Sequence, residues 1–126
     1  MRLLVVEDSA LLRRMFGLAF PHQRHDVAEA ENGRQALALL EGISEPFDAV
    51  LLDLRMPDMD GAEFIRGLRR LPVHRATPVV ITTAEPDDSP LMRSALAAGV
   101  GAVVKKPWTP RSLQAAVQQV LNSRTE

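Results

Sequence analysis

The 126-residue sequence contains no cysteine and has almost no excess of charge of either sign. Without cysteine, a disulfide framework and thiolate metal or redox sites are excluded, and the cytosol is the default compartment. The formal net charge is −1, from 15 basic and 16 acidic residues. No overall field therefore favours nucleic acid or an anionic membrane, and a partner must be recognised locally.

A long hydrophobic run is also missing at the N-terminus. The apolar segment 3–6 is followed directly by Glu7 and Asp8, so we expect neither a signal peptide nor a membrane span there. With 126 residues, 46% of them hydrophobic, the chain can bury one core but has no room for a second folded domain. We therefore expect one soluble, cytoplasmic domain over residues 1–126.

Short apolar segments alternate with segments of helical periodicity along the whole chain. In the first helical segment Leu11, Met15 and Leu18 recur at helical spacing before Pro21, and four further helices are predicted in the same way. The strands are predicted at 3–6, 26–30, 49–52, 79–83 and 102–104. Because right-handed crossovers place helices on both faces of a parallel sheet, the predicted class is α/β, a doubly wound five-stranded parallel sheet.

Asp53 stands where the third predicted strand should end. An aspartate is costly inside a sheet but natural at the carboxyl edge, where open α/β sheets form their ligand crevice. The segment 56–61 that follows contains a proline and a glycine typical of a turn, with Asp60 as a helix N-cap. Because loops after parallel strands share one edge, further polar residues should join Asp53 there: Glu7, Asp8, Thr83 and either Lys105 or Lys106.

Three carboxylates at one edge predict a bound cation. They repel one another unless a positive ion shares the space, and the candidate ligands are all oxygens, which favours Mg²⁺ or Mn²⁺ over Zn²⁺. Mg²⁺ leaves coordination positions open for a phosphoryl donor, so Asp53 can act as a nucleophile that forms an acyl phosphate. A lysine would neutralise charge on the transferred group and Thr83 could donate a hydrogen bond to it. The Lys106-Pro107 bond is a candidate for a cis peptide.

These motifs, in this order, resemble the receiver domain of two-component response regulators over essentially the whole chain. The likeness rests on the acidic pair after the first strand, on Asp53 followed by Met-Pro-Asp-Met-Asp-Gly at 56–61, on Thr83-Ala84 and on Lys106-Pro107. The resemblance implies a flavodoxin-like (βα)5 fold with strand order 2-1-3-4-5.

The same resemblance implies the role of each site residue. Asp53 would accept phosphate from a histidine kinase or a phosphotransfer protein, or from small donors, and the surface of helix 4, strand 5 and helix 5 would change in response. Thr83 would sense the phosphoryl group and Lys106 would contact it. The Mg²⁺ ligands would be Glu7, Asp8, Asp53 and the backbone carbonyl of Arg55.

Two positions depart from or add to that pattern. Val103 occupies the place of the aromatic switch residue common in the family, and a valine cannot swing between exposed and buried states. Arg55 and Glu85 each stand two residues after a site residue. We hypothesise that they pair above the phosphoryl group and hinder the in-line attack of water.

The sequence also has to be weighed against other functional classes. An unphosphorylated pseudo-receiver would be a pure interaction module that needs no metal. A phosphatase using an aspartyl phosphate is disfavoured, since Asp53-Leu54-Arg55 lacks the general acid of an Asp-x-Asp pair. A flavodoxin-like electron carrier is disfavoured because the acidic first loop would repel a flavin phosphate. We interpret the arginines as a solvated helix face, without direct nucleic-acid binding: Arg66, Arg69, Arg70 and Arg75.

Overall fold

The structure is a computed structural model that describes residues 1–125. Five parallel strands form one sheet in the order β2-β1-β3-β4-β5, which confirms the predicted strand order. The strands are β1 (Arg2–Val6), β2 (Asp26–Ala30), β3 (Ala49–Asp53), β4 (Val79–Thr83) and β5 (Ala102–Lys105). The helices are α1 (Ala10–Ala19), α2 (Gly33–Glu41), α3 (Gly61–Arg69), α4 (Pro90–Ala98) and α5 (Pro110–Thr125), with a 3-10 turn η1 (Pro72–His74).

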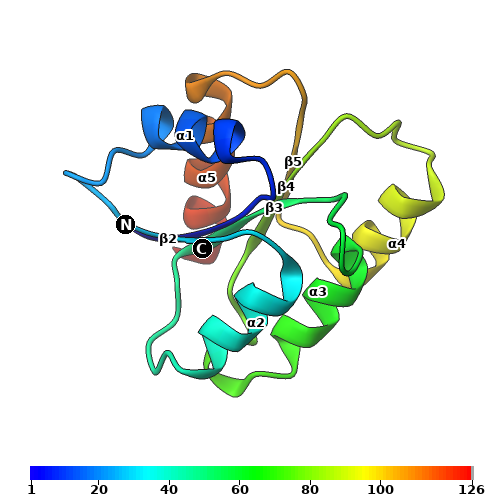
Figure 1. Ribbon diagram of the computed structural model, residues 1–126, viewed down its shortest axis with the longest axis horizontal. Coiled ribbons are helices and arrows are strands. Elements are labelled where there is room, and N and C mark those ends of the chain that lie inside the picture. The colour runs from blue at the N-terminus through cyan, green and yellow to red at the C-terminus, as the bar shows by residue number, and fades with distance from the viewer. Residues whose placement is uncertain (126) are drawn as a thin grey trace.

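The helices cover both faces of the sheet. Figure 1 shows α1 and α5 on one face and α2, α3 and α4 on the other. Successive residues of β3 pack into the hydrophobic cores on opposite faces of the sheet. Leu51 packs on the α1 and α5 side, and Leu52 on the side of α2, α3 and α4. Every residue of β3 and β4 is buried, as expected for central strands of a parallel sheet.

The strand register aligns the carboxyl ends that carry the candidate site. Val6 pairs with Leu52, Asp53 with Thr82, and Thr83 with Lys105. The loops that leave β1, β3, β4 and β5 therefore start at the same edge of the sheet, as predicted.

Helix α1 forms where the sequence predicts it, but two of its periodic leucines face solvent. Leu11 is 66% exposed and Leu18 is 69% exposed. The buried side of α1 is formed by Phe16 and Ala19, and Phe16 packs on Trp108 with 4.8 Å between ring centroids. Apolar residues stand on nearly every side of this helix, so their spacing alone did not indicate which side faces the sheet.

Two aspartates near the end of the loop after β3 hold that loop in place. Asp60 caps α3 as predicted, since its carboxylate accepts a hydrogen bond of 2.8 Å from the Glu63 backbone N–H. The Asp58 carboxylate accepts hydrogen bonds from the backbone N–H groups of Gly33 and Arg34, at 3.1 Å and 2.7 Å. Asp58 thus ties the loop that follows Asp53 to the N-terminus of α2.

Within residues 1–125, no helix combines the length and the apolar character needed to cross a lipid bilayer.

Candidate phosphoacceptor and metal site

Glu7 follows β1 and is almost completely buried. Its side chain is 1% exposed, its Oε2 accepts a hydrogen bond of 3.1 Å from the Ser9 backbone N–H, and its buried Oε1 has no hydrogen-bond partner. Burial raises the pKa of Glu7 from its ordinary 4.5 to about 7; the Ser9 hydrogen bond opposes the shift and the negative charge of Asp53 adds to it. A buried carboxylate oxygen without a donor is a position at which a cation would be stabilised.

Asp53 is the last residue of β3 and lies at the floor of the site. It is 7% exposed, and its Oδ1 lies 3.4 Å from both the Lys106 ammonium group and the Arg55 backbone N–H. Burial raises the pKa of Asp53, while the positive charge and hydrogen bond of Lys106 work in the opposite direction. The carboxylate is therefore poorly solvated and has one strong cationic partner.

The carboxylates of Glu7, Asp8 and Asp53 converge as predicted. One oxygen from each lies within 4.8 Å of the other two, with Asp8 exposed and the other two buried. All three donors are oxygens, and the buried Glu7 Oε1 has no hydrogen-bond partner. The residues present therefore fit a hard divalent cation such as Mg²⁺ or Mn²⁺.

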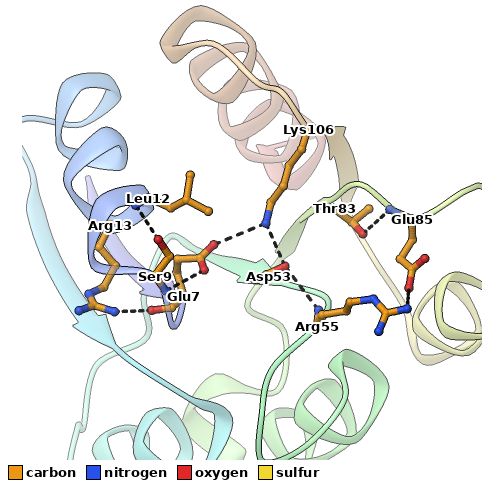
Figure 2. A network of polar contacts seen from close by, with 9 residues as sticks. All are labelled: Glu7, Ser9, Leu12, Arg13, Asp53, Arg55, Thr83, Glu85 and Lys106. Atoms are coloured by element: carbon orange, nitrogen blue, oxygen red, sulfur yellow. Dashed lines mark hydrogen bonds and ion pairs between the residues drawn. The ribbon is translucent and has the colours of Figure 1, made fainter.

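Lys106 approaches this cluster from the loop after β5. Figure 2 shows its ammonium group between two carboxylates, 3.4 Å from Asp53 and 3.8 Å from Glu7. The peptide bond to Pro107 is cis, as the sequence indicated. The neighbouring Lys105 points elsewhere, because its ammonium group pairs with Asp87 at 2.8 Å and donates to the Glu85 backbone carbonyl.

Thr83 completes the hollow from the end of β4. It is buried, and its Oγ1 accepts a hydrogen bond of 2.9 Å from the Glu85 backbone N–H, which leaves the hydroxyl proton available as a donor. The hollow has a volume of about 370 Å³. All the predicted site residues except Glu7 line it. The full lining consists of Asp8, Asp53, Arg55, Thr83, Ala84, Glu85 and Lys106.

Arg55 and Glu85 form the predicted ion pair, and both residues line this hollow (Figure 2). Their closest N···O distance is 2.6 Å, with the Glu85 side chain 13% exposed and the Arg55 side chain 76% exposed. The position of the Arg55 backbone carbonyl as a metal ligand stays a prediction.

Some residues that shape the site were not singled out from the sequence. The Arg13 guanidinium donates a 2.6 Å hydrogen bond to the Glu7 backbone carbonyl, and the Ser9 hydroxyl accepts one of 3.2 Å from the Leu12 backbone N–H. Ser9 is therefore the N-cap of α1, which a serine just before a helix could have signalled. Asp58 left no such signal, since its partners are about 25 residues away in the chain.

These features define an α/β protein of the doubly wound class, with an acidic cluster and a lysine at the carboxyl edge of its sheet. Residues 3–118 match the family model of the response regulator receiver domain, so the chain belongs to this family. Receiver domains are signalling modules of two-component systems that interact with histidine kinases or phosphotransfer proteins, and the family binds Mg²⁺ through acidic residues.

Relatives of this chain include stand-alone and longer proteins. It is 34% identical over 124 residues to a chemotaxis protein CheY homolog of Campylobacter jejuni, covering 98% of this chain and 94% of that protein. It is 32% identical over 125 residues to the transcriptional regulatory protein ResD of Bacillus subtilis, covering 99% of this chain. The chain thus spans only half the length of ResD.

Solved structures share the fold. The receiver domain of the sensor histidine kinase PA1611 from Pseudomonas aeruginosa superposes with a TM-score of 0.84 at 26% identity, over 96% of this chain and 97% of that chain. That crystal structure has a magnesium ion coordinated in its active site cleft.

Proposed function

We propose that residues 1–126 form a single receiver domain that acts as a phosphorylation-controlled switch. Asp53 accepts a phosphoryl group from the phosphohistidine of a histidine kinase or phosphotransfer protein, and the chain catalyses only this transfer and its own dephosphorylation. The observation that carries the proposal is the placement of the Asp53 carboxylate at the floor of a 370 Å³ hollow, 3.4 Å from the Lys106 ammonium group.

The acidic cluster is proposed to hold Mg²⁺ or Mn²⁺. The ligands would be the carboxylates of Glu7, Asp8 and Asp53 and the backbone carbonyl of Arg55. Bound there, the ion would supply positive charge next to the transferred phosphoryl group. The buried Glu7 Oε1, which lacks a hydrogen-bond partner, and the magnesium ion in the related PA1611 receiver domain support this assignment.

Three side chains of the protein have separate roles in the phosphoryl transfer. An Asp53 carboxylate oxygen attacks phosphorus while the bond from phosphorus to the histidine nitrogen breaks. Lys106 neutralises charge on the phosphoryl oxygens, and Thr83 donates its free hydroxyl proton to one of them.

Phosphorylation adds a charge of about −1.5 to −2, which attracts groups at the ends of β4 and β5. Thr83 and Lys106 are drawn inward, and the face formed by α4, β5 and α5 favours a second state with changed partner affinity. Val103 packs, partly buried, against the core under α2, α3 and α4, so the transmission proposed here runs through Thr83 and the backbone.

Intact-mass analysis with acetyl phosphate tests the proposed function. Incubation with Mg²⁺ should add the mass of one phosphoryl group, and chelation of the metal should prevent the gain. If the chain binds Mg²⁺ but acetyl phosphate does not label it, the same assay with a phosphorylated histidine kinase as the donor tests whether Asp53 accepts phosphate from a protein. If neither donor labels it, the chain is an interaction module and the proposal is wrong.

The Arg55–Glu85 pair is proposed to slow dephosphorylation. Both residues line the hollow, so the pair would obstruct a water molecule approaching phosphorus in line with the Asp53 oxygen. We expect Arg55→Ala to shorten the lifetime of the phosphorylated protein several-fold, as followed by the decay of the phosphorylated mass after removal of the donor.

Two variants serve as controls for that measurement. Glu85→Ala should shorten the lifetime in the same way, and the double variant should add little, because both changes remove the same ion pair. Arg111→Ala changes an exposed arginine at the start of α5 and should leave the lifetime unchanged. An unaltered lifetime in Arg55→Ala would refute the idea.

A further inference from the structure

A second hollow, separate from the phosphoacceptor site, lies between α3 and α4. The two helices run side by side on one face of the sheet (Figure 1). The hollow has a volume of about 560 Å³ and shares no lining residue with the phosphoacceptor hollow. One wall is basic and the other is made of small side chains: Arg66 and Arg69 from α3 with Arg70 directly after it, and Ser94, Ala97 and Ala98 from α4.

No carboxylate of the described residues balances the positive charge of this hollow. No carboxylate lines it, and within residues 1–125 none forms an ion pair with its three arginines. Arg2 and Arg13, by contrast, each pair with two carboxylates. The C-terminus of α3 favours positive charge, but that preference does not require all three side chains to face the same hollow. Like charges one turn apart repel, so an anion placed between them would be stabilised.

Arg69 is held in place by the backbone beneath it. One guanidinium nitrogen donates hydrogen bonds to the carbonyls of Arg75 and Thr77, at 3.1 Å and 2.6 Å. A guanidinium group has five N–H donors in a rigid fork, so Arg69 keeps donors for a ligand while its position is fixed. Arg66 and Arg70 are exposed, stand about one helical turn apart and both line the hollow.

The dimensions favour a small ligand over a protein segment. The volume lies within the range of about 300–1,000 Å³ typical of small-molecule sites. Residues one turn apart on a helix have Cβ atoms about 6 Å from each other, which suits phosphate groups joined within one molecule. The short side chains of α4 leave space for the rest of such a molecule, and the Ser94 hydroxyl adds a neutral hydrogen-bond donor.

We propose that the hollow between α3 and α4 binds a small ligand that carries at least two phosphate groups. Arg66 and Arg70 each form a bidentate pair with a phosphate, Arg69 contacts them from the floor, and Ser94 donates from the opposite wall. Binding is non-covalent and needs no divalent metal, because the arginines supply the positive charge. This role differs from the solvated helix face expected from the sequence.

Titration with inorganic pyrophosphate in the presence of a metal chelator tests the proposal. Amide and arginine Nε–H signals are followed by heteronuclear NMR. We expect saturable shifts centred on Arg66, Arg70 and Ser94, with binding weakened about tenfold by Arg66→Ala and by Arg70→Ala. Arg111→Ala, which removes an exposed arginine outside the hollow, should bind pyrophosphate like the wild type. Circular dichroism confirms that each variant is folded.

Three results would overturn the proposal. The first is the absence of saturable binding, and the second is unchanged affinity in both arginine variants. The third is a shift pattern centred on Thr83 and Lys106, which would place pyrophosphate in the phosphoacceptor hollow. An oligoglutamate peptide is titrated in parallel; if it alone saturates the α3 and α4 signals, the surface is a docking site for an acidic protein segment and the small-ligand proposal is wrong.

Discussion

Replacing Asp53 by asparagine is expected to abolish phosphorylation by acetyl phosphate. The amide has the shape of the carboxylate, but its oxygen lacks the negative charge needed to attack phosphorus and its nitrogen would meet the Lys106 ammonium group. Intact-mass analysis should show the full gain of one phosphoryl group in the wild type and none in the variant.

Asp58→Asn is the matched control for that experiment. It makes the same chemical change five residues further along the chain, where the carboxylate contacts α2 and not the hollow. This variant should be phosphorylated like the wild type. If Asp53→Asn were still labelled, peptide mapping of the modified residue would identify a different acceptor and refute the assignment.

Replacing Glu7 by glutamine is expected to stabilise the metal-free protein at neutral and alkaline pH. The pKa of Glu7 is raised to about 7, so in the folded protein the group keeps its proton over a range in which the unfolded chain, with a pKa near 4.5, has lost it. Between these two values the folded state binds more protons than the unfolded state. The free energy of unfolding therefore falls as pH rises from about 4.5 through 7, and the whole penalty is present above that range.

The size of the effect follows from the shift. Each unit of pKa corresponds to about 1.4 kcal/mol, so the shift from 4.5 to about 7 implies a penalty on the order of 3 kcal/mol in the wild type at about pH 8. Thermal unfolding without metal should give Glu7→Gln a higher melting temperature than the wild type, by several degrees at this pH and by little near about pH 5.

Magnesium should reverse the order of the melting temperatures of the wild type and Glu7→Gln. A cation at the cluster offsets the charge of the buried carboxylate, so Mg²⁺ should raise the melting temperature of the wild type at about pH 8 far more than that of Glu7→Gln. Equal pH dependence of unfolding in both proteins would show that Glu7 does not titrate as its burial indicates.

The secondary structure could be predicted because its signals are local. The apolar run before Asp53 and the β-branched run of 79–83 indicated buried strands, and Gly99, which has a φ of +101°, ends α4 as a C-terminal glycine should. The face of α1 was not predictable from spacing, because Leu11 and Leu18 had the periodicity of a buried stripe yet lie in solvent. Only packing against the sheet and Trp108 selected Phe16 for that side.

The sequence by itself determined the alternation of strands and helices and, through parallel topology, the edge at which Glu7, Asp53 and Thr83 meet. Strand placement alone left Lys105 and Lys106 both possible; the family resemblance favoured Lys106, and the tertiary structure places its ammonium group at the carboxylates. Only the tertiary structure decided that burial raises the pKa of Glu7 to about 7 and that three arginines line one hollow with α4. The physical reason is that propensity and periodicity act between near neighbours in the chain. Side-chain direction, loss of solvent and charge–charge distance depend on residues that are brought together only by folding.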